Sequence, residues 1–174
     1  MTLLLCLAGM MMVSCSSHYK TVKRNKKDNT QIKADEKIIK EIERVLKGDE
    51  KKILDEAMEW LGTPYTYARQ DKGVATDCSG FVMMVFDTAI GCKLPRNSAK
   101  QSEFCDHINA KKVKPGDLVF FITNNGNKIN HVGIMIDDVQ FIHASTKGVK
   151  ISSLEQTFYK THFKNFGRVP GMKH

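Results

Sequence analysis

The sequence lacks several features that would assign it to a class of proteins at once. Its uncharged apolar run at residues 1–15 is shorter than the ~20 helical residues that span a bilayer. No internal repeat is visible, and no RNA- or DNA-binding motif accompanies the Lys and Arg residues, which are spread along the chain. The close-spaced Cys and His pairs of structural zinc sites are absent as well. We therefore expect no membrane-spanning segment, no nucleic-acid partner and no structural zinc site.

The overall composition fits one domain with an appendage. A chain of 174 residues is somewhat longer than a compact domain of ~100–150 residues, and 41% hydrophobic residues suffice for one core. The formal net charge of +8 predicts that the protein tolerates or seeks anionic surroundings. We divide the chain into a signal segment (1–15), a tether (16–33) and a domain (34–174).

The N-terminal segment predicts export. Residues 1–15, "MTLLLCLAGMMMVSC", form the short apolar run of an export signal. Its last four residues, Met12 to Cys15, resemble a bacterial lipobox, which implies that Cys15 is lipidated and anchors the protein to a bacterial membrane facing the cell wall. A simple cleaved signal peptide, or a buried N-terminal segment, is the alternative. Residues 16–33 are polar and basic, so we expect a flexible tether.

The remaining pattern predicts an α+β fold. Apolar residues at helical spacing over 38–46 and 53–61 predict two amphipathic helices, and Gly62 and Pro64 end the second. The segment from Cys78 to about Ile90 is apolar nearly all round, which predicts a helix buried in the middle of the fold. After Lys111, four short β-rich runs separated by turn signals predict an antiparallel meander, and residues 168–170 a last edge strand. Helices first and strands afterwards indicate a sheet with helices packed on one side.

The placement of one thiol and two imidazoles indicates nucleophilic catalysis. Cys78 falls in the first turn of the buried helix, where the helix dipole and unpaired backbone N–H groups favour a thiolate. His131 begins one predicted strand and His143 ends the next, so a hairpin turning at Asp137 and Asp138 would bring the two side by side. The three residues can then form a nucleophile, a base and an orienting group.

Six segments between residues 53 and 170 carry a family resemblance. They are "LGTPYTY", "DCSGFV", "LPRNSAKQ", "KPGDLVFF", "HVGIMI" and "FIHAS", in that order. Together they resemble the NlpC-type cell-wall peptidases, papain-like cysteine endopeptidases of bacterial peptidoglycan. The resemblance implies a papain-like domain with Cys78 as nucleophile, His131 as general base and His143 as the third polar residue. It also implies that a tyrosine, Tyr65 or Tyr67, lines the site.

Further residues are candidates for the substrate pocket. Ser79 and Gly80 are small enough to leave a substrate carbonyl room beside the helix terminus, where the Cys78 N–H could donate to an oxyanion. Arg96 and Gln101, with Ser98, match a family segment near the cleft. Asp77 is included, although we favour a helix N-cap for it. The pocket candidates are Tyr65, Asp77, Ser79, Gly80, Arg96 and Gln101.

The predicted function is hydrolysis of stem-peptide amide bonds in peptidoglycan, with the γ-D-glutamyl bond to the diamino acid implied by the resemblance. We expect a monomer that needs no metal or other cofactor. The alternatives are an amidase or acyltransferase on the same scaffold, a catalytically silent wall-binding lipoprotein, and a zinc site made of the Cys-His-His set. Cys92 and Cys105, left over in an oxidising compartment, predict either a disulfide or two buried thiols.

Overall fold

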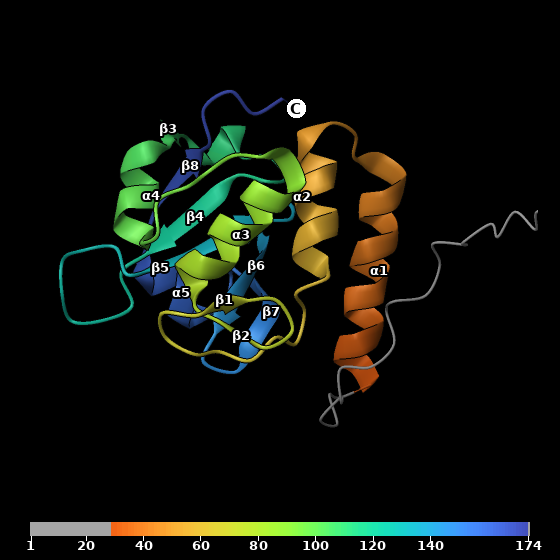
Figure 1. The fold of residues 1–174 in the computed structure, drawn as a ribbon, viewed down its shortest axis with the longest axis horizontal. Helices are drawn as coiled ribbons and strands as arrows, with labels where there is room; N and C mark the ends of the chain where they lie inside the picture. The colour runs from red at the N-terminus through yellow and green to blue at the C-terminus, as the bar shows by residue number, and fades with distance from the viewer. Residues whose placement is uncertain (1–28, 174) are drawn as a thin grey trace, which may run out of the picture.

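The structure, a computed structural model, describes residues 29–173 (Figure 1). The predicted signal segment, Cys15 and most of the predicted tether lie outside these residues. Among the residues described, no helix combines the length and the apolar character needed to cross a membrane. The elements in chain order are α1 (Asn29–Val45), α2 (Asp49–Met58), β1 (Gln70–Asp71), β2 (Ala75–Thr76), α3 (Cys78–Ile90), α4 (Ser98–Phe104), β3 (Asp106–Ile108), the 3-10 turn η1 (Ala110–Lys112), β4 (Leu118–Phe121), β5 (His131–Met135), β6 (Gln140–Ser145), β7 (Gly148–Ser153), α5 (Thr157–His162) and β8 (Phe163–Arg168).

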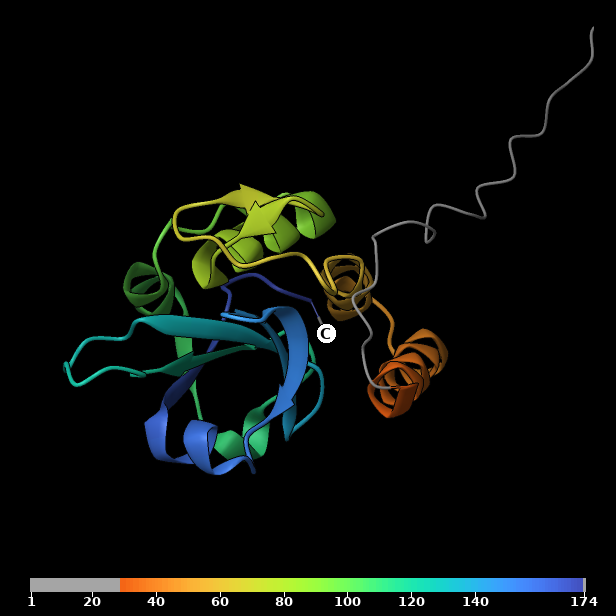
Figure 2. The same cartoon turned by 90° about the horizontal axis from the view of Figure 1, so that it is seen from below.

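The two predicted N-terminal helices are confirmed as α1 and α2, which lie side by side (Figures 1 and 2). The helix α1 begins at Asn29, inside the range predicted as tether (16–33). The boundary differs because composition alone marks residues 29–33 as polar, whereas Gln31 and Lys33 are good helix formers that extend an adjacent helix. The buried helix predicted from Cys78 to Ile90 is α3, with the same bounds.

The main sheet has six antiparallel strands in the order β3-β8-β4-β5-β6-β7. The four predicted strands after Lys111 are β4 to β7, so the meander is confirmed. The prediction of a last edge strand at residues 168–170 is wrong, because β8 spans Phe163–Arg168 and lies between β3 and β4. The edge position belongs to the short strand β3, whose three residues carry too little β signal to be predicted.

The sheet separates two apolar clusters. Leu118 and Phe120 of β4 join a cluster with α2 and α3, whereas Val119 and Phe121 point to the other face and join a cluster with Tyr159 of α5. Figure 2 shows α2 and α3 above the sheet and α5 below it. The α+β class is therefore confirmed, but helices cover both faces instead of one, because β4 is apolar at all four positions.

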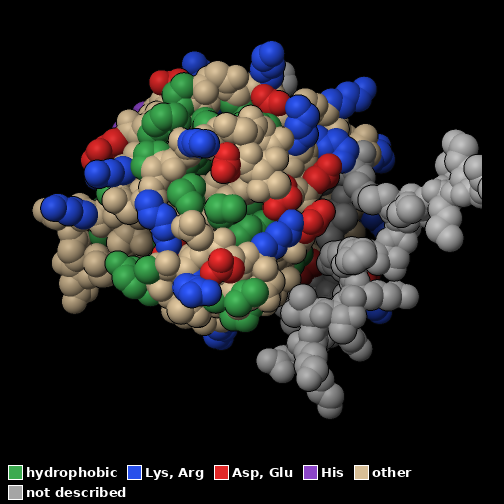
Figure 3. Space-filling model, viewed as in Figure 1, with side chains coloured by type: hydrophobic (Ala, Val, Ile, Leu, Met, Phe, Trp, Pro, Cys, Tyr) green, Lys and Arg blue, Asp and Glu red, His purple; other side chains and the backbone are tan. Residues whose placement is uncertain are grey.

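Charged side chains of both signs are interspersed on the face seen in Figure 3. The positive net charge is thus not gathered into one continuous basic patch on this face. Two ion pairs join the loop before α3 to the α2 region: Lys72 Nζ lies 2.9 Å from Glu56 Oε1 and 2.6 Å from Glu59 Oε2.

Candidate active site

Cys78 begins α3 because Asp77 caps that helix. The backbone of Asp77 is extended (φ −100°, ψ 176°), and its Oδ1 accepts the N–H of Gly80 at 2.7 Å, which confirms the predicted N-cap. The first N–H groups of a helix, here those of Cys78 and Ser79, have no acceptor within the helix. The thiol therefore lies at the positive end of α3, next to donors that could serve an oxyanion.

A partly buried network around Arg96 fixes this helix start. The guanidinium of Arg96 donates to both carboxylate oxygens of Asp77 at 2.9 and 2.7 Å, to Ser79 Oγ at 3.0 Å and to the Arg69 carbonyl at 3.3 Å. The N–H of Ala68 donates to Asp77 Oδ2 at 2.8 Å, although Ala68 has a φ of 62°. Burial raises the pKa of Asp77, but Arg96 and the backbone donors outweigh burial and lower it. Asp77 and Arg96 thus act as a pair that joins the preceding loop to α3.

Gly80 and Gln101 also support the helix start. A Cβ on Gly80 would lie 2.5 Å from the Arg69 carbonyl oxygen, so this backbone group takes the room that the sequence assigned to a substrate carbonyl. Gln101 is fully buried, and its Nε2 donates to the carbonyls of Ser79 and Pro95 at 3.0 and 2.8 Å. Both residues therefore hold α3 and α4 in place.

The thiol of Cys78 is buried against the strand that carries the predicted base. Its side chain is 7% exposed, and Sγ donates to the carbonyl of Asn130, the residue before His131, at 3.8 Å. Burial, and then the charge of Asp77, raise the pKa of Cys78 to about 11 against the opposing effect of nearby backbone N–H groups. The expectation of a resting thiolate is therefore wrong, because the helix terminus lowers the pKa by less than burial raises it.

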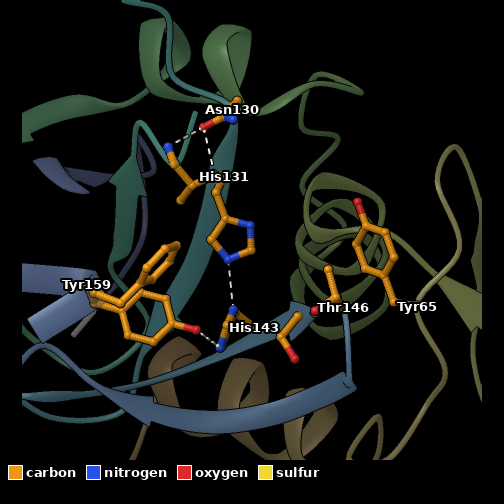
Figure 4. Close-up of a pocket in the computed structure, with 10 residues that line it drawn as sticks. Tyr65, Asn130, His131, His143, Thr146 and Tyr159 are labelled. Atoms are coloured by element: carbon orange, nitrogen blue, oxygen red, sulfur yellow. Dashed lines mark hydrogen bonds between the residues drawn. The ribbon is translucent and has the colours of Figure 1, made fainter. Parts of the chain in front are cut away.

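The two histidines are in direct contact, as the hairpin predicted. His131 Nε2 lies 2.7 Å from His143 Nδ1, with the rings nearly perpendicular (Figure 4). Burial lowers the pKa of His131 to about 4, and burial with the nearby His131 and Lys150 lowers the pKa of His143 well below its ordinary value. Both rings are therefore neutral near pH 7, and the site at rest holds a neutral thiol and two neutral imidazoles.

Gly133 makes room for this contact, and the sequence analysis missed it. A Cβ at Gly133 would lie 2.7 Å from the Phe141 ring and 3.2 Å from His143 Cβ. The segment "HVGIMI" placed this glycine two residues after His131, in a strand interior where glycine often marks a close approach. That spacing was the available signal.

Two hydroxyl groups behind His143 were also missed. The Nε2 of His143 lies 3.0 Å from Ser152 Oγ on β7 and 3.1 Å from the Tyr159 hydroxyl on α5. His143 is 1% exposed and Ser152 3% exposed. No local motif marks either hydroxyl, because they reach His143 only through strand pairing and the packing of α5.

A cavity of about 270 Å³ opens in front of the histidines. Tyr65 lines it together with His131, His143 and Tyr159 (Figure 4). Burial and the neighbouring Cys78 raise the pKa of Tyr65, whereas Tyr67 is 83% exposed, so Tyr65 is the one of these two predicted tyrosines that lies at the cavity. The lining of this cavity does not include the other predicted pocket residues, which are Asp77, Ser79, Gly80, Arg96 and Gln101.

Two predictions concern the other cysteines and possible metal ligands. Cys92 and Cys105 are both free thiols, so the disulfide is not formed and the two-thiol alternative holds, although only Cys105 is fully buried. Within residues 29–173, no group of three or more Cys, His, Asp or Glu side chains is arranged to hold a metal ion. Instead, the ring nitrogens of His131 and His143 bond to each other.

Comparison with known proteins matches this region of the chain. Residues 62–168 match the profile of the NlpC/P60 family. "Probable endopeptidase NlpC" of Escherichia coli K12 is 40% identical over 116 residues, which cover 66% of this chain and 75% of that protein. "Murein DD-endopeptidase MepS/Murein LD-carboxypeptidase" of the same strain is 37% identical over 119 residues, which cover 68% of this chain and 62% of that protein.

Solved structures show the same fold. A protein from Staphylococcus aureus subsp. aureus Mu50, described as similar to lipoprotein, NLP/P60 family, superposes with a TM-score of 0.65 and 31% sequence identity. The match covers 70% of this chain and 41% of that longer chain, so this chain spans less than half of its length. The residues matched to the family profile include Cys78, His131 and His143.

Proposed function

Because this chain belongs to the NlpC/P60 family of cysteine peptidases, we propose that it cleaves amide bonds in the stem peptides of peptidoglycan through an acyl-enzyme on Cys78. One arrangement supports the proposal. The thiol of Cys78, the first residue of a buried helix, contacts the carbonyl of Asn130 at the start of the strand that carries His131. On the other side of the His131 ring, its Nε2 lies 2.7 Å from Nδ1 of His143. This is the order nucleophile, base and orienting group that acyl transfer requires.

The neutral resting pair determines how the reaction begins. Since the pKa of Cys78 is about 11 and that of His131 about 4, the thiol keeps its proton until substrate is bound. His131 then takes that proton as the sulfur attacks the scissile carbonyl. The resulting oxyanion accepts a hydrogen bond from the backbone N–H of Cys78 at the helix terminus. His131 returns the proton to the leaving amine, the C–N bond breaks, and water, deprotonated by His131, hydrolyses the thioester.

The bond we propose is the one between γ-D-glutamate and the following diamino acid, which the family resemblance implies. A second candidate is the D-alanyl cross-link, because the relative named a murein DD-endopeptidase is 37% identical to this chain. The two bonds give different products. Cleavage at γ-D-glutamate shortens a monomeric stem peptide, whereas cleavage of the cross-link converts dimeric fragments into monomers.

We further propose that the protein is exported, and that lipidated Cys15 anchors it to a membrane facing the cell wall. The support is the "MVSC" sequence and the peptidoglycan that the relative's name gives as its substrate. Intact mass of the protein made in a lipidating host tests the anchor. A mature chain that starts elsewhere, without lipid, would remove it from the proposal.

Mass spectrometry of purified monomeric and cross-linked peptidoglycan fragments, after digestion, tests the activity. We expect cleavage by the wild type, none by Cys78→Ala and almost none by His131→Ala. His143→Ala should be milder, with His143→Asn or His143→Gln partly restoring turnover, because a hydrogen-bonding side chain still orients the base. Cys92→Ala, which changes a free thiol outside the site, is the matched control and should retain full activity.

Other outcomes would identify the alternatives. Full activity in Cys78→Ala would contradict the mechanism. Binding of intact peptidoglycan by a wild type that cleaves nothing would indicate a silent wall-binding protein. Loss of both metal and stability in the Cys78 and His131 variants, with destabilisation of the wild type by a chelator, would indicate zinc. Release or transfer of other acyl groups would indicate an amidase or acyltransferase.

A further inference from the structure

His143 is held between the base and a pair of hydroxyl groups. Its Nδ1 lies 2.7 Å from His131 Nε2, and its Nε2 lies 3.0 Å from Ser152 Oγ and 3.1 Å from the Tyr159 hydroxyl. Figure 4 shows the line of contacts from His131 through His143 to Tyr159. Each ring nitrogen of His143 therefore has polar partners, and the position of its single proton depends on all of them.

Counting protons gives two arrangements. A neutral imidazole carries one N–H, so the 2.7 Å contact needs one donor and one acceptor. In the first, His131 donates from Nε2 to His143 Nδ1, and the proton of His143 is on Nε2. In the second, His143 donates from Nδ1, and the proton of His131 moves to its Nδ1. Only the first leaves the Nδ1 lone pair of His131 free to accept the thiol proton.

We propose that Ser152 and Tyr159 are positioning residues that select the first arrangement by accepting the Nε2–H of His143. The proposal rests on the function proposed above, in which His131 is the base. The proposal assigns roles to Ser152 and Tyr159 and a tautomer to each histidine. The identities of the nucleophile, the base and the third polar residue do not by themselves define these tautomers. A hydroxyl that accepts from Nε2 fixes the proton of His143, and His143 in turn fixes that of His131.

The second contact of Ser152 supports this direction. Burial raises the pKa of Tyr159, but the neighbouring Ser152 hydroxyl lowers it, which indicates that Ser152 acts as a donor toward the phenol oxygen. A serine hydroxyl has one proton. When that proton is donated to the phenol oxygen, the lone pairs of Ser152 remain for the Nε2–H of His143. The Tyr159 hydroxyl, which lines the cavity, can then direct its own proton toward a substrate acceptor.

The frame around the two hydroxyls keeps them in place. Ser152 is directly opposite Phe141 in the β6–β7 ladder. The Tyr159 ring packs on the rings of Phe121 and Phe141, with centroids 5.4 and 4.9 Å apart. Tyr159→Phe can therefore keep this packing while removing the hydroxyl, which makes it a clean test.

The direct measurement is the histidine tautomer. We would record long-range ¹H–¹⁵N spectra of the wild type with ¹⁵N-labelled histidine, and of Ser152→Ala, Tyr159→Phe and the double variant, without substrate. We expect wild-type His131 and His143 each to carry the proton on Nε2. In the double variant, the buried Nε2–H of His143 loses its acceptors, so a population with protons on Nδ1 of both rings should appear.

Kinetics provide the second readout. We expect kcat to fall about 10- to 100-fold in the double variant with KM changed less than threefold, and Ser152→Thr, which keeps the hydroxyl, to retain more activity than Ser152→Ala. Thr161→Ala on the exposed side of α5 is the control and should change neither readout. Wild-type spectra with the His143 proton on Nδ1, or tautomers and kcat unchanged in the double variant, would overturn the proposal. If the wild type cleaves no stem peptide but the tautomers shift as expected, the positioning role is supported and only the proposed function fails.

Discussion

Replacing Arg96 with methionine keeps an unbranched side chain but removes the cation that pairs with Asp77 at the start of α3. Four hydrogen bonds are lost, two to Asp77 and one each to Ser79 Oγ and the Arg69 carbonyl. Asp77 keeps the N–H donors of Ala68 and Gly80, so it stays ionised, and its charge, no longer paired, lies next to the thiol. We therefore expect lower stability and a higher pKa of Cys78.

The size of the effect follows from the burial of the two partners. The side chain of Asp77 is 7% exposed and that of Arg96 is 38% exposed. Removing one partner of a buried pair costs about 3–5 kcal/mol, and an exposed pair contributes about 0–1 kcal/mol. Since more than a third of Arg96 is in solvent, we expect a loss of about 2 kcal/mol in unfolding free energy. For a chain of this size, that loss lowers Tm by about 4–8 °C.

Urea unfolding followed by tryptophan fluorescence is the assay. Trp60 is the only tryptophan of the chain and is 1% exposed. Its ring packs edge-on against that of Phe81 of α3, with the ring centroids 5.7 Å apart, so its fluorescence reports on this helix. Arg44→Met is the matched control, because Arg44 pairs with Glu41 on the exposed face of α1 and should change nothing measurable. The reasoning is refuted if Arg96→Met is no more costly than Arg44→Met, or if it costs as much in an Asp77→Asn background as in the wild type.

Four other outcomes follow from the site and its surroundings. Because the pKa of Cys78 is about 11, its alkylation by iodoacetamide should accelerate about tenfold per pH unit between pH 6 and 9, and a plateau below pH 8 would show a preformed thiolate. Burial lowers the pKa of His131 from 6.5 to about 4, so only the unfolded chain gains this proton between those values. His131 alone should therefore lower the unfolding free energy, measured in urea, by up to about 3 kcal/mol as pH drops from 6.5 to 4, and His143, whose pKa is lowered in the same direction, should add to that fall; a flat profile would refute this. Gly133→Ala should lower kcat on stem-peptide fragments at least tenfold, because the new methyl group displaces the Phe141 ring and Cβ of His143. Gly126→Ala, in an exposed loop, is the control and should leave kcat unchanged; equal kcat in the two variants would contradict this account. Ala68→Gly should raise the unfolding free energy by about 0.5–1 kcal/mol, because φ is 62° there, and a loss of stability would refute the strain.

The local parts of the site could be predicted from the sequence because each has a local cause. Asp77 caps α3 through the N–H three residues on, so the position of Cys78 follows from a short segment. His131 and His143 meet because one hairpin joins their strands, and hairpin turns have a clear sequence signal. These features depend on neighbours in sequence, which a pattern can show.

The rest depends on distant packing that no local pattern records. Arg96 reaches Asp77 across 19 residues, and Tyr159 reaches His143 across 16, so their partners are defined only by the fold. The thiolate expectation was wrong for the same reason. The dipole at a helix start can be read from a sequence, whereas the desolvation that outweighs it comes from elements that close over Cys78.

The neutral thiol of Cys78 also affects how the protein withstands oxidants. Thiolates attack peroxides and disulfides much faster than thiols do, and the oxidation of cysteine to sulfenic and then sulfinic acid begins from the thiolate. With a pKa of about 11, only about one Cys78 in ten thousand is ionised at pH 7. For the exported enzyme proposed above, which would lie where no glutathione pool repairs a cysteine, Cys78 is thus stored in its least oxidisable form and becomes reactive only while a substrate carbonyl is there to receive it.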